Sequence, residues 1–206
     1  AVIVGIVLIY TIVYHIYSQR EAVISSIITL QFSFFLLLLG YTIYSSSTTV
    51  QSVDFWSRVS YMGLSISPVF GIRFIEAVMK RSFKKTKYAA FLLCILCIVL
   101  IWADDKWIIT HTLNYGTHPT MLKGAGFNIL LVYIMGSLLI CYVFFMRYYI
   151  KNPSSRSLYW PLAAGFTGWC ASGVYGALNA ASIIRLPDFP WVGPVVMMLM
   201  FAIFQG

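Results

Sequence analysis

The sequence is dominated by long apolar stretches that are separated by short polar connections. A helix of about 20 apolar residues crosses the hydrocarbon core of a bilayer, and helix tilt or a snorkelling lysine accommodates some variation in length. The stretches are continuous rather than alternating, which argues against the strands of a transmembrane barrel. We therefore predict an all-α membrane protein, with residues 1–206 forming a single bundle of seven transmembrane helices. The expected spans are residues 1–17, 22–44, 55–79, 88–103, 127–148, 159–181 and 189–204.

The composition agrees with a membrane protein and excludes several other classes. Of the 206 residues, 60% are hydrophobic and 10% are charged, whereas a soluble domain carries about 25% charged residues. This excludes a soluble enzyme and a secreted disulfide-bonded scaffold. The formal net charge is +8, and in a membrane protein such an excess belongs to loops that face anionic lipid headgroups. We therefore expect contacts with membrane lipids and no nucleic-acid partner.

The distribution of Lys and Arg among the connections predicts the orientation of the chain. Basic residues are in excess after the third and fifth apolar stretches, the connection after the first holds Arg20 and Glu21, and the other three connections are balanced. Because cytoplasmic loops carry the excess of Lys and Arg, we expect a multi-pass membrane protein with its N-terminus outside and its C-terminus in the cytoplasm. The connection after the third stretch is the most basic, with Lys80, Arg81, Lys84, Lys85 and Lys87.

The longest of the predicted outer connections is residues 104–126. It contains apolar side chains that need to be buried, and its Asn114–Gly116 and His118-Pro119 segments are typical of turns. This pattern predicts a β-hairpin or a short helix lying across the outer mouth of the bundle.

Motifs of catalysis and cofactor binding are absent from the sequence. The stretch 189–204 has no lysine for a retinal Schiff base, and the chain has no Walker, GxGxxG, HExxH or GxSxG motif. His15 has no second histidine at a matching depth, and we interpret Cys94 and Cys97 as small apolar side chains of a helix face. We therefore expect no enzyme activity, no cofactor and no metal site in this chain.

Aromatic and polar side chains gather in the predicted outer halves of the helices and in the outer connections. One interpretation is an aromatic belt at the headgroup level, with polar groups that hold helices together. The other is a cup open to the outside that binds a small ligand by apolar contacts and a few polar anchors. The residues concerned are Tyr41, Trp56, Arg58, Tyr61, Trp107, His111, Asn128, Tyr175, Asn179 and Trp191.

The stretch 55–79 also carries charge near its predicted cytoplasmic end. Arg73 and Glu76 are three residues apart, so they can pair on one helix face. They either snorkel to the interface or form a polar latch between helices that shifts on signalling. Pro68, in the middle of the same stretch, favours a kink.

The segment Phe55-Trp56-Ser57-Arg58-Val59-Ser60-Tyr61-Met62-Gly63, continuing to Pro68 and Phe74, resembles the third helix of a known family. This family is the seven-helix N-terminal sensor region of bacterial membrane histidine kinases. Residues 105–111, 123–127 and 190–194 are similar to its outer loop, its entry into helix five and its last helix.

The resemblance implies a sensor input module of the bacterial inner membrane whose seventh helix continues into a cytoplasmic output, such as a histidine kinase or a diguanylate cyclase. It implies that Arg58 and His111 lie where the signal arrives, and it is compatible with a homodimer. Our leading hypothesis is thus a receptor that binds a small, amphiphilic molecule or a lipid from the outer side. The alternatives are a transporter with Tyr175 and Asn179 at a mid-membrane site, and a structural subunit without a ligand.

Overall fold

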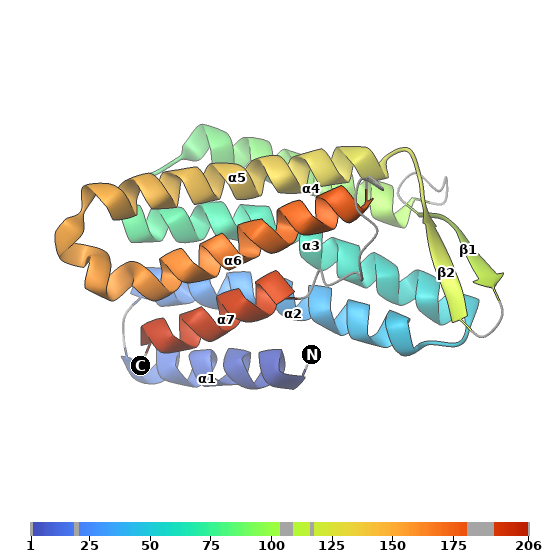
Figure 1. Cartoon of the computed structure of the whole chain (residues 1–206), viewed down its shortest axis with the longest axis horizontal. Helices are drawn as coiled ribbons and strands as arrows, with labels where there is room; N and C mark the ends of the chain where they lie inside the picture. The colour runs from blue at the N-terminus through green and yellow to red at the C-terminus, as the bar shows by residue number, and fades with distance from the viewer. Residues whose placement is uncertain (1, 19–20, 104–108, 116–117, 181–191, 206) are drawn as a thin grey trace.

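The structure is a computed structural model that describes residues 2–18, 21–103, 109–115, 118–180 and 192–205. Within these ranges it contains seven α-helices and one two-stranded antiparallel hairpin, and the helices run up and down in a bundle (Figure 1). The predicted all-helical class with seven helices is confirmed for this part of the chain. The elements are α1 (Val2–Ser18), α2 (Glu21–Ser46), α3 (Val50–Met79), α4 (Lys84–Trp102), β1 (Ile109–Tyr115), β2 (His118–Lys123), α5 (Phe127–Lys151), the 3-10 turn η1 (Pro153–Ser155), α6 (Arg156–Ala180) and α7 (Val192–Gln205).

Each predicted apolar stretch lies on one of these helices, although the bounds differ. Among the described residues, α2, α3, α4 and α5 are long and apolar enough to cross a membrane, and α7 is a shorter apolar helix. Seven crossings therefore stay a prediction. Helix α3 begins at Val50 rather than at residue 55 because Thr49 caps it, its Oγ1 accepting the Ser52 N–H at 3.4 Å. Residues 1, 181 and 189–191 of the predicted spans lie outside the described ranges.

The long connection between α4 and α5 contains the hairpin, which is one of the two forms that the sequence allowed. Strands β1 and β2 pair in antiparallel fashion, with Tyr115 opposite His118 beside the turn. The hairpin contacts α3 and lies at the end of the bundle where α2 leads into α3 (Figure 1). Its backbone thus adjoins the first turns of α3.

Helix α3 is the central element, because it contacts α2, α4, α5 and the hairpin. Its contact with α2 is unusually close. A Cβ atom added to Gly63 would lie 2.5 Å from the backbone nitrogen of Leu37, and one added to Gly40 would lie 2.5 Å from that of Ser60. The Ser60 hydroxyl also donates to the Leu37 carbonyl at 2.9 Å. Glycine and serine therefore let the two backbones meet, as is common between membrane helices.

Pro68 lies inside α3, yet the helix continues through it. Proline has no N–H, so the carbonyl four residues earlier loses its helical partner. That carbonyl belongs to Leu64, and it accepts the Ser67 hydroxyl at 2.9 Å instead. A neighbouring hydroxyl thus satisfies the group that proline leaves free, as membrane helices with proline require.

The core is centred on six buried rings from five helices, here called the central aromatic cluster. Phe74 of α3 lies 5.5 Å from Phe201 of α7 and 5.8 Å from Phe166 of α6, measured between ring centroids. The remaining members are Phe34 of α2, Phe145 of α5 and Trp169 of α6. The cluster joins α7 to α3 directly, and such ring pairs favour particular relative positions of the helices that carry them.

Candidate functional site

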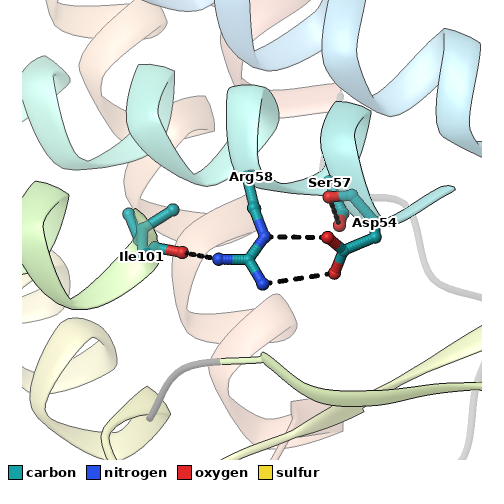
Figure 2. A network of polar contacts seen from close by, with 4 residues as sticks. All are labelled: Asp54, Ser57, Arg58 and Ile101. Carbon is teal, nitrogen blue, oxygen red and sulfur yellow. Dashed lines mark hydrogen bonds and ion pairs between the residues drawn. The ribbon is translucent and has the colours of Figure 1, made fainter. Parts of the chain in front are cut away.

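The first polar network lies at the hairpin end of α3 and is built around Arg58. Its Nε donates to Oδ2 of Asp54 at 3.0 Å, and its Nη2 donates to Oδ1 at 3.4 Å. Its Nη1 donates to the backbone carbonyl of Ile101 in α4 (Figure 2). The Arg58 side chain is 14% exposed and that of Asp54 is 39% exposed. A single guanidinium thus engages a carboxylate in a forked pair and also joins α3 to α4.

The position of the Ile101 carbonyl explains why a cation is favourable there. The last four carbonyls of an α-helix have no N–H partner within the helix, and the helix dipole places partial negative charge at this end. Ile101 belongs to the last turn of α4, which ends at Trp102. Arg58 therefore stabilises the C-terminus of α4 from a neighbouring helix.

The second polar network lies at the opposite end of α3 and is built around Glu76. Its Oε2 accepts the Lys87 ammonium at 2.8 Å, and its Oε1 accepts the Phe83 N–H at 2.6 Å and the Ser82 hydroxyl at 3.2 Å. Phe83 is the N-cap residue of α4 and supplies no capping side chain. Glu76 therefore places its negative charge at the N-terminus of α4, where the dipole favours it.

This arrangement corrects the expected ion pair between Arg73 and Glu76. Arg73 is exposed and forms no ion pair in the described part of the chain, whereas Glu76 pairs with Lys87. The helical spacing favoured Arg73, but the turn between α3 and α4 brings Lys87 to the carboxylate. Glu76 does link two helices, and a shift of this link on signalling stays a prediction.

A third contact links the middle of α3 to the second turn of α4 through α5. The Tyr133 hydroxyl of α5 lies 3.1 Å from the carbonyl of Ser65 in α3 and 3.1 Å from that of Ala90 in α4. The hydroxyl has one proton to donate, so these two carbonyls share it. Sequence reasoning missed Tyr133, whose only signal is a tyrosine in the middle of an apolar stretch.

The other predicted ligand residues on α2 and α3 contact neighbouring rings. Ring centroids of Tyr41 and Tyr44 are 5.1 Å apart, and those of Tyr61 and Phe127 are 5.7 Å apart. Trp56 contacts Phe55 at 5.3 Å, and Phe55 in turn contacts Trp102 of α4 at 5.8 Å. The rings of Phe55, Trp56 and Trp102 therefore lie at the Arg58 end of the α3–α4 pair.

The remaining predicted ligand residues are more widely placed. Asn128 is exposed in the first turn of α5, and Tyr175 and Asn179 are half-buried on α6. His111 lies in β1, where its backbone is opposite Leu122. Trp107 and Trp191 lie outside the described residues. A single cup formed by all ten residues stays a prediction.

Gln31 of α2 is a polar residue that sequence reasoning missed. Its side chain is fully buried, and neither amide atom has a hydrogen-bond partner among the described residues. A buried amide without partners is costly. Its sequence signal is a glutamine inside an otherwise apolar stretch.

The described residues contain no group of three or more His, Cys, Asp or Glu side chains placed to hold a metal ion.

Long apolar helices that pack around α3, with Arg58 and Glu76 near its two ends, define a helical membrane protein. A model of the family described as the N-terminal 7TM region of histidine kinase matches residues 1–205, and the chain belongs to this family. The predicted resemblance is thereby confirmed. No curated protein matches the sequence. The matched region is the sensor part of such kinases rather than their catalytic part.

Proposed function

We propose that this chain is the sensor input region of a histidine kinase of the bacterial inner membrane. It binds a small amphiphilic molecule or a lipid from the outer side and passes the change through α7 to the cytoplasmic kinase domain. Membership of the family supports the sensor role.

The charge distribution supports an outer N-terminus and a cytoplasmic C-terminus. The α3–α4 turn lies between Lys80 and Lys85, and the α5–α6 turn follows Lys151. Both turns lie at the same end of the bundle as the end of α7 (Figure 1). Loops rich in Lys and Arg remain in the cytoplasm. In this orientation Arg58 and the hairpin are on the outer side.

The chemistry around Arg58 supports an amphiphilic ligand. A guanidinium is a strong anchor for an anionic headgroup, and Asp54, its partner, is partly exposed. The rings of Phe55, Trp56 and Trp102 provide apolar surface nearby. A ligand anion that competes with Asp54 for Arg58 would also disturb the bond from Arg58 to Ile101.

The observation that carries the proposal is that α3 contains Arg58 and also packs against α7. At one end of α3, Arg58 holds the last turn of α4, and further along, Phe74 packs on Phe201 of α7. A ligand shifts an equilibrium between two arrangements only if it binds them with different affinity. The Arg58 contacts provide such a difference, and the Phe74–Phe201 contact provides a route to α7.

The test uses the full-length protein in lipid vesicles and measures autophosphorylation from ATP, so it requires no knowledge of the ligand. We expect Arg58→Gln to change the basal rate severalfold, because the α3–α4 contact then loses its charge. Gln51→Ala, an exposed residue at the same end of α3, is the matched control and should leave the rate unchanged. An unchanged rate in Arg58→Gln, or solute flux in the same vesicles, would argue for the structural or transporter alternative.

A further inference from the structure

A groove with a volume of about 470 Å³ lies between α2 and α3, at the end of the bundle opposite Arg58. It is bordered by the first turns of α2, by the last turns of α3 and by the residues that follow α3. None of the ten predicted ligand residues lines it. The lining residues are Ala22, Ser25, Arg73, Glu76, Ala77, Lys80, Arg81 and Ser82.

Among the described residues, the groove carries an excess of positive charge. Glu76 is its one acidic lining residue, and the ammonium of Lys87 already pairs with that carboxylate. Arg73, Lys80 and Arg81 form no ion pair within the described ranges. The Arg81 guanidinium lies 5.9 Å from the centre of the Phe83 ring, which leaves its N–H groups available.

The local backbone explains why three consecutive residues face the groove. Lys80 has φ 50°, a left-handed conformation that non-glycine residues rarely adopt. It ends α3, and the N–H groups of both Lys80 and Arg81 donate to the Glu76 carbonyl. This is a Schellman-type ending, which turns the chain back across the end of the helix. Lys80, Arg81 and Ser82 consequently line the groove together.

We propose that this groove binds a phosphate group, carried either by the headgroup of an anionic lipid or by a soluble phosphate. Guanidinium and ammonium groups are the usual partners of phosphate, and the Ser25 hydroxyl can also donate to it. The first turns of α2 add the partial positive charge of a helix N-terminus. Basic pockets between membrane helices on the cytoplasmic side commonly hold anionic headgroups. The site is distinct from the proposed outer ligand and does not depend on it.

The test measures lipid retention by the purified chain in detergent micelles, with native mass spectrometry as the readout. The probes are phosphatidylglycerol and phosphatidylcholine with the same acyl chains. Each cation near an anionic headgroup contributes roughly fivefold to affinity. We therefore expect Arg73→Gln combined with Arg81→Gln to weaken phosphatidylglycerol binding about tenfold or more, with little effect on phosphatidylcholine.

Lys80→Gly is a second variant that keeps the fold, because glycine readily adopts the left-handed conformation at this position. It should weaken phosphatidylglycerol binding about fivefold. The matched control is Lys84→Gln combined with Lys85→Gln, which removes two cations from exposed positions at the same end of the bundle that do not line the groove.

The outcomes separate the two sources of phosphate. Displacement of phosphatidylglycerol by millimolar inorganic phosphate would assign the groove to a soluble phosphate, whereas retention despite phosphate would assign it to the lipid. Equal losses in the groove variants and in the Lys84/Lys85 control would overturn the proposal, because general surface charge would then explain the binding. Equal retention of the two lipids by the unsubstituted chain, without any binding of phosphate, would overturn it as well.

Discussion

The Arg58 side chain forms bonds within its own helix, α3, and to the neighbouring helix α4. It pairs with Asp54 one turn earlier in α3, and it donates to the carbonyl of Ile101 in α4. The contact with Asp54 is local and could be anticipated from the i,i+4 spacing. The contact with Ile101 depends on where α4 packs, and it is the one that gives Arg58 structural importance beyond its own helix.

We predict that Arg58→Gln lowers the free energy of unfolding by about 1–2 kcal/mol, because the Ile101 carbonyl and the Asp54 carboxylate both lose a charged donor. Asp54→Asn should have a smaller effect, because Arg58 keeps its bond to α4 and Asp54 is partly exposed. Thermal unfolding of the purified chain in detergent, followed by tryptophan fluorescence, measures both. Equal effects of the two substitutions would show that the bond to Ile101 contributes little.

At the scale of elements, the closest contact is between α2 and α3. Gly63 and Gly40 lie where the two backbones meet, and the Ser60 hydroxyl bonds across the contact. The approach is so close that a methyl group has no space. We therefore expect α2 and α3 to move together. Small residues are required where the two helices meet, because a larger side chain would overlap the facing backbone.

We predict that Gly63→Ala lowers the free energy of unfolding by about 1–3 kcal/mol, because the added Cβ would overlap the backbone of α2. Gly136→Ala in α5 is the matched control, since nothing lies within 4 Å of its added Cβ. Alanine favours the helix over glycine by up to about 1 kcal/mol, so this control should be neutral or stabilising. Chemical unfolding of the two variants in the same detergent provides the comparison. A Gly63→Ala variant as stable as Gly136→Ala would contradict the close contact.

Features that depend on local composition were predictable from the sequence. Continuous apolar stretches gave the seven helices approximately, and turn residues near Asn114 allowed the hairpin. Contacts between helices could be predicted less well from the sequence. The shared helix face favours Arg73 as the partner of Glu76, whereas the structure pairs Glu76 with Lys87, which the α3–α4 turn brings close. Likewise, no sequence pattern indicates that Tyr133 reaches carbonyls of two other helices.

At the scale of the whole molecule, large apolar side chains on α4 face outward. Leu92, near the middle of the helix, is 67% exposed, and Tyr88, Phe91, Leu96 and Val99 are also exposed. A soluble protein rarely exposes so continuous an apolar surface. In a membrane this face lies against lipid, where it requires no further partner.

We predict that Leu92→Asp greatly reduces the amount of folded chain in the membrane fraction, because an aspartate at the centre of a membrane helix costs about 2.5–3.5 kcal/mol. Leu92→Ala should leave that amount unchanged, because an exposed side chain leaves no cavity when it is shortened. Membrane fractionation with quantitative immunoblotting distinguishes them. Normal levels of Leu92→Asp would indicate that this face is not in contact with the hydrocarbon core.

The orientation of the whole bundle leads to a separate prediction. A cysteine introduced at exposed Lys85 should react with a membrane-impermeant maleimide only after cells are lysed, whereas one at exposed Thr48 should react in spheroplasts. The native cysteines of the chain are buried or half-buried. Labelling of the unsubstituted chain gives the background signal from these cysteines. Labelling of Lys85→Cys in intact spheroplasts would reverse the orientation on which the proposed signalling direction depends.

Both ends of α4 are held by charged side chains of a single neighbouring helix, with Arg58 at its C-terminus and Glu76 at its N-terminus. This limits how chimeric sensors can be assembled. If α4 were grafted from another family member while α3 was kept, the donor helix would have to match the spacing between these two side chains. An insertion of one residue into either helix alone would leave one terminus without its counter-charge. Helices α3 and α4 should therefore be transplanted together.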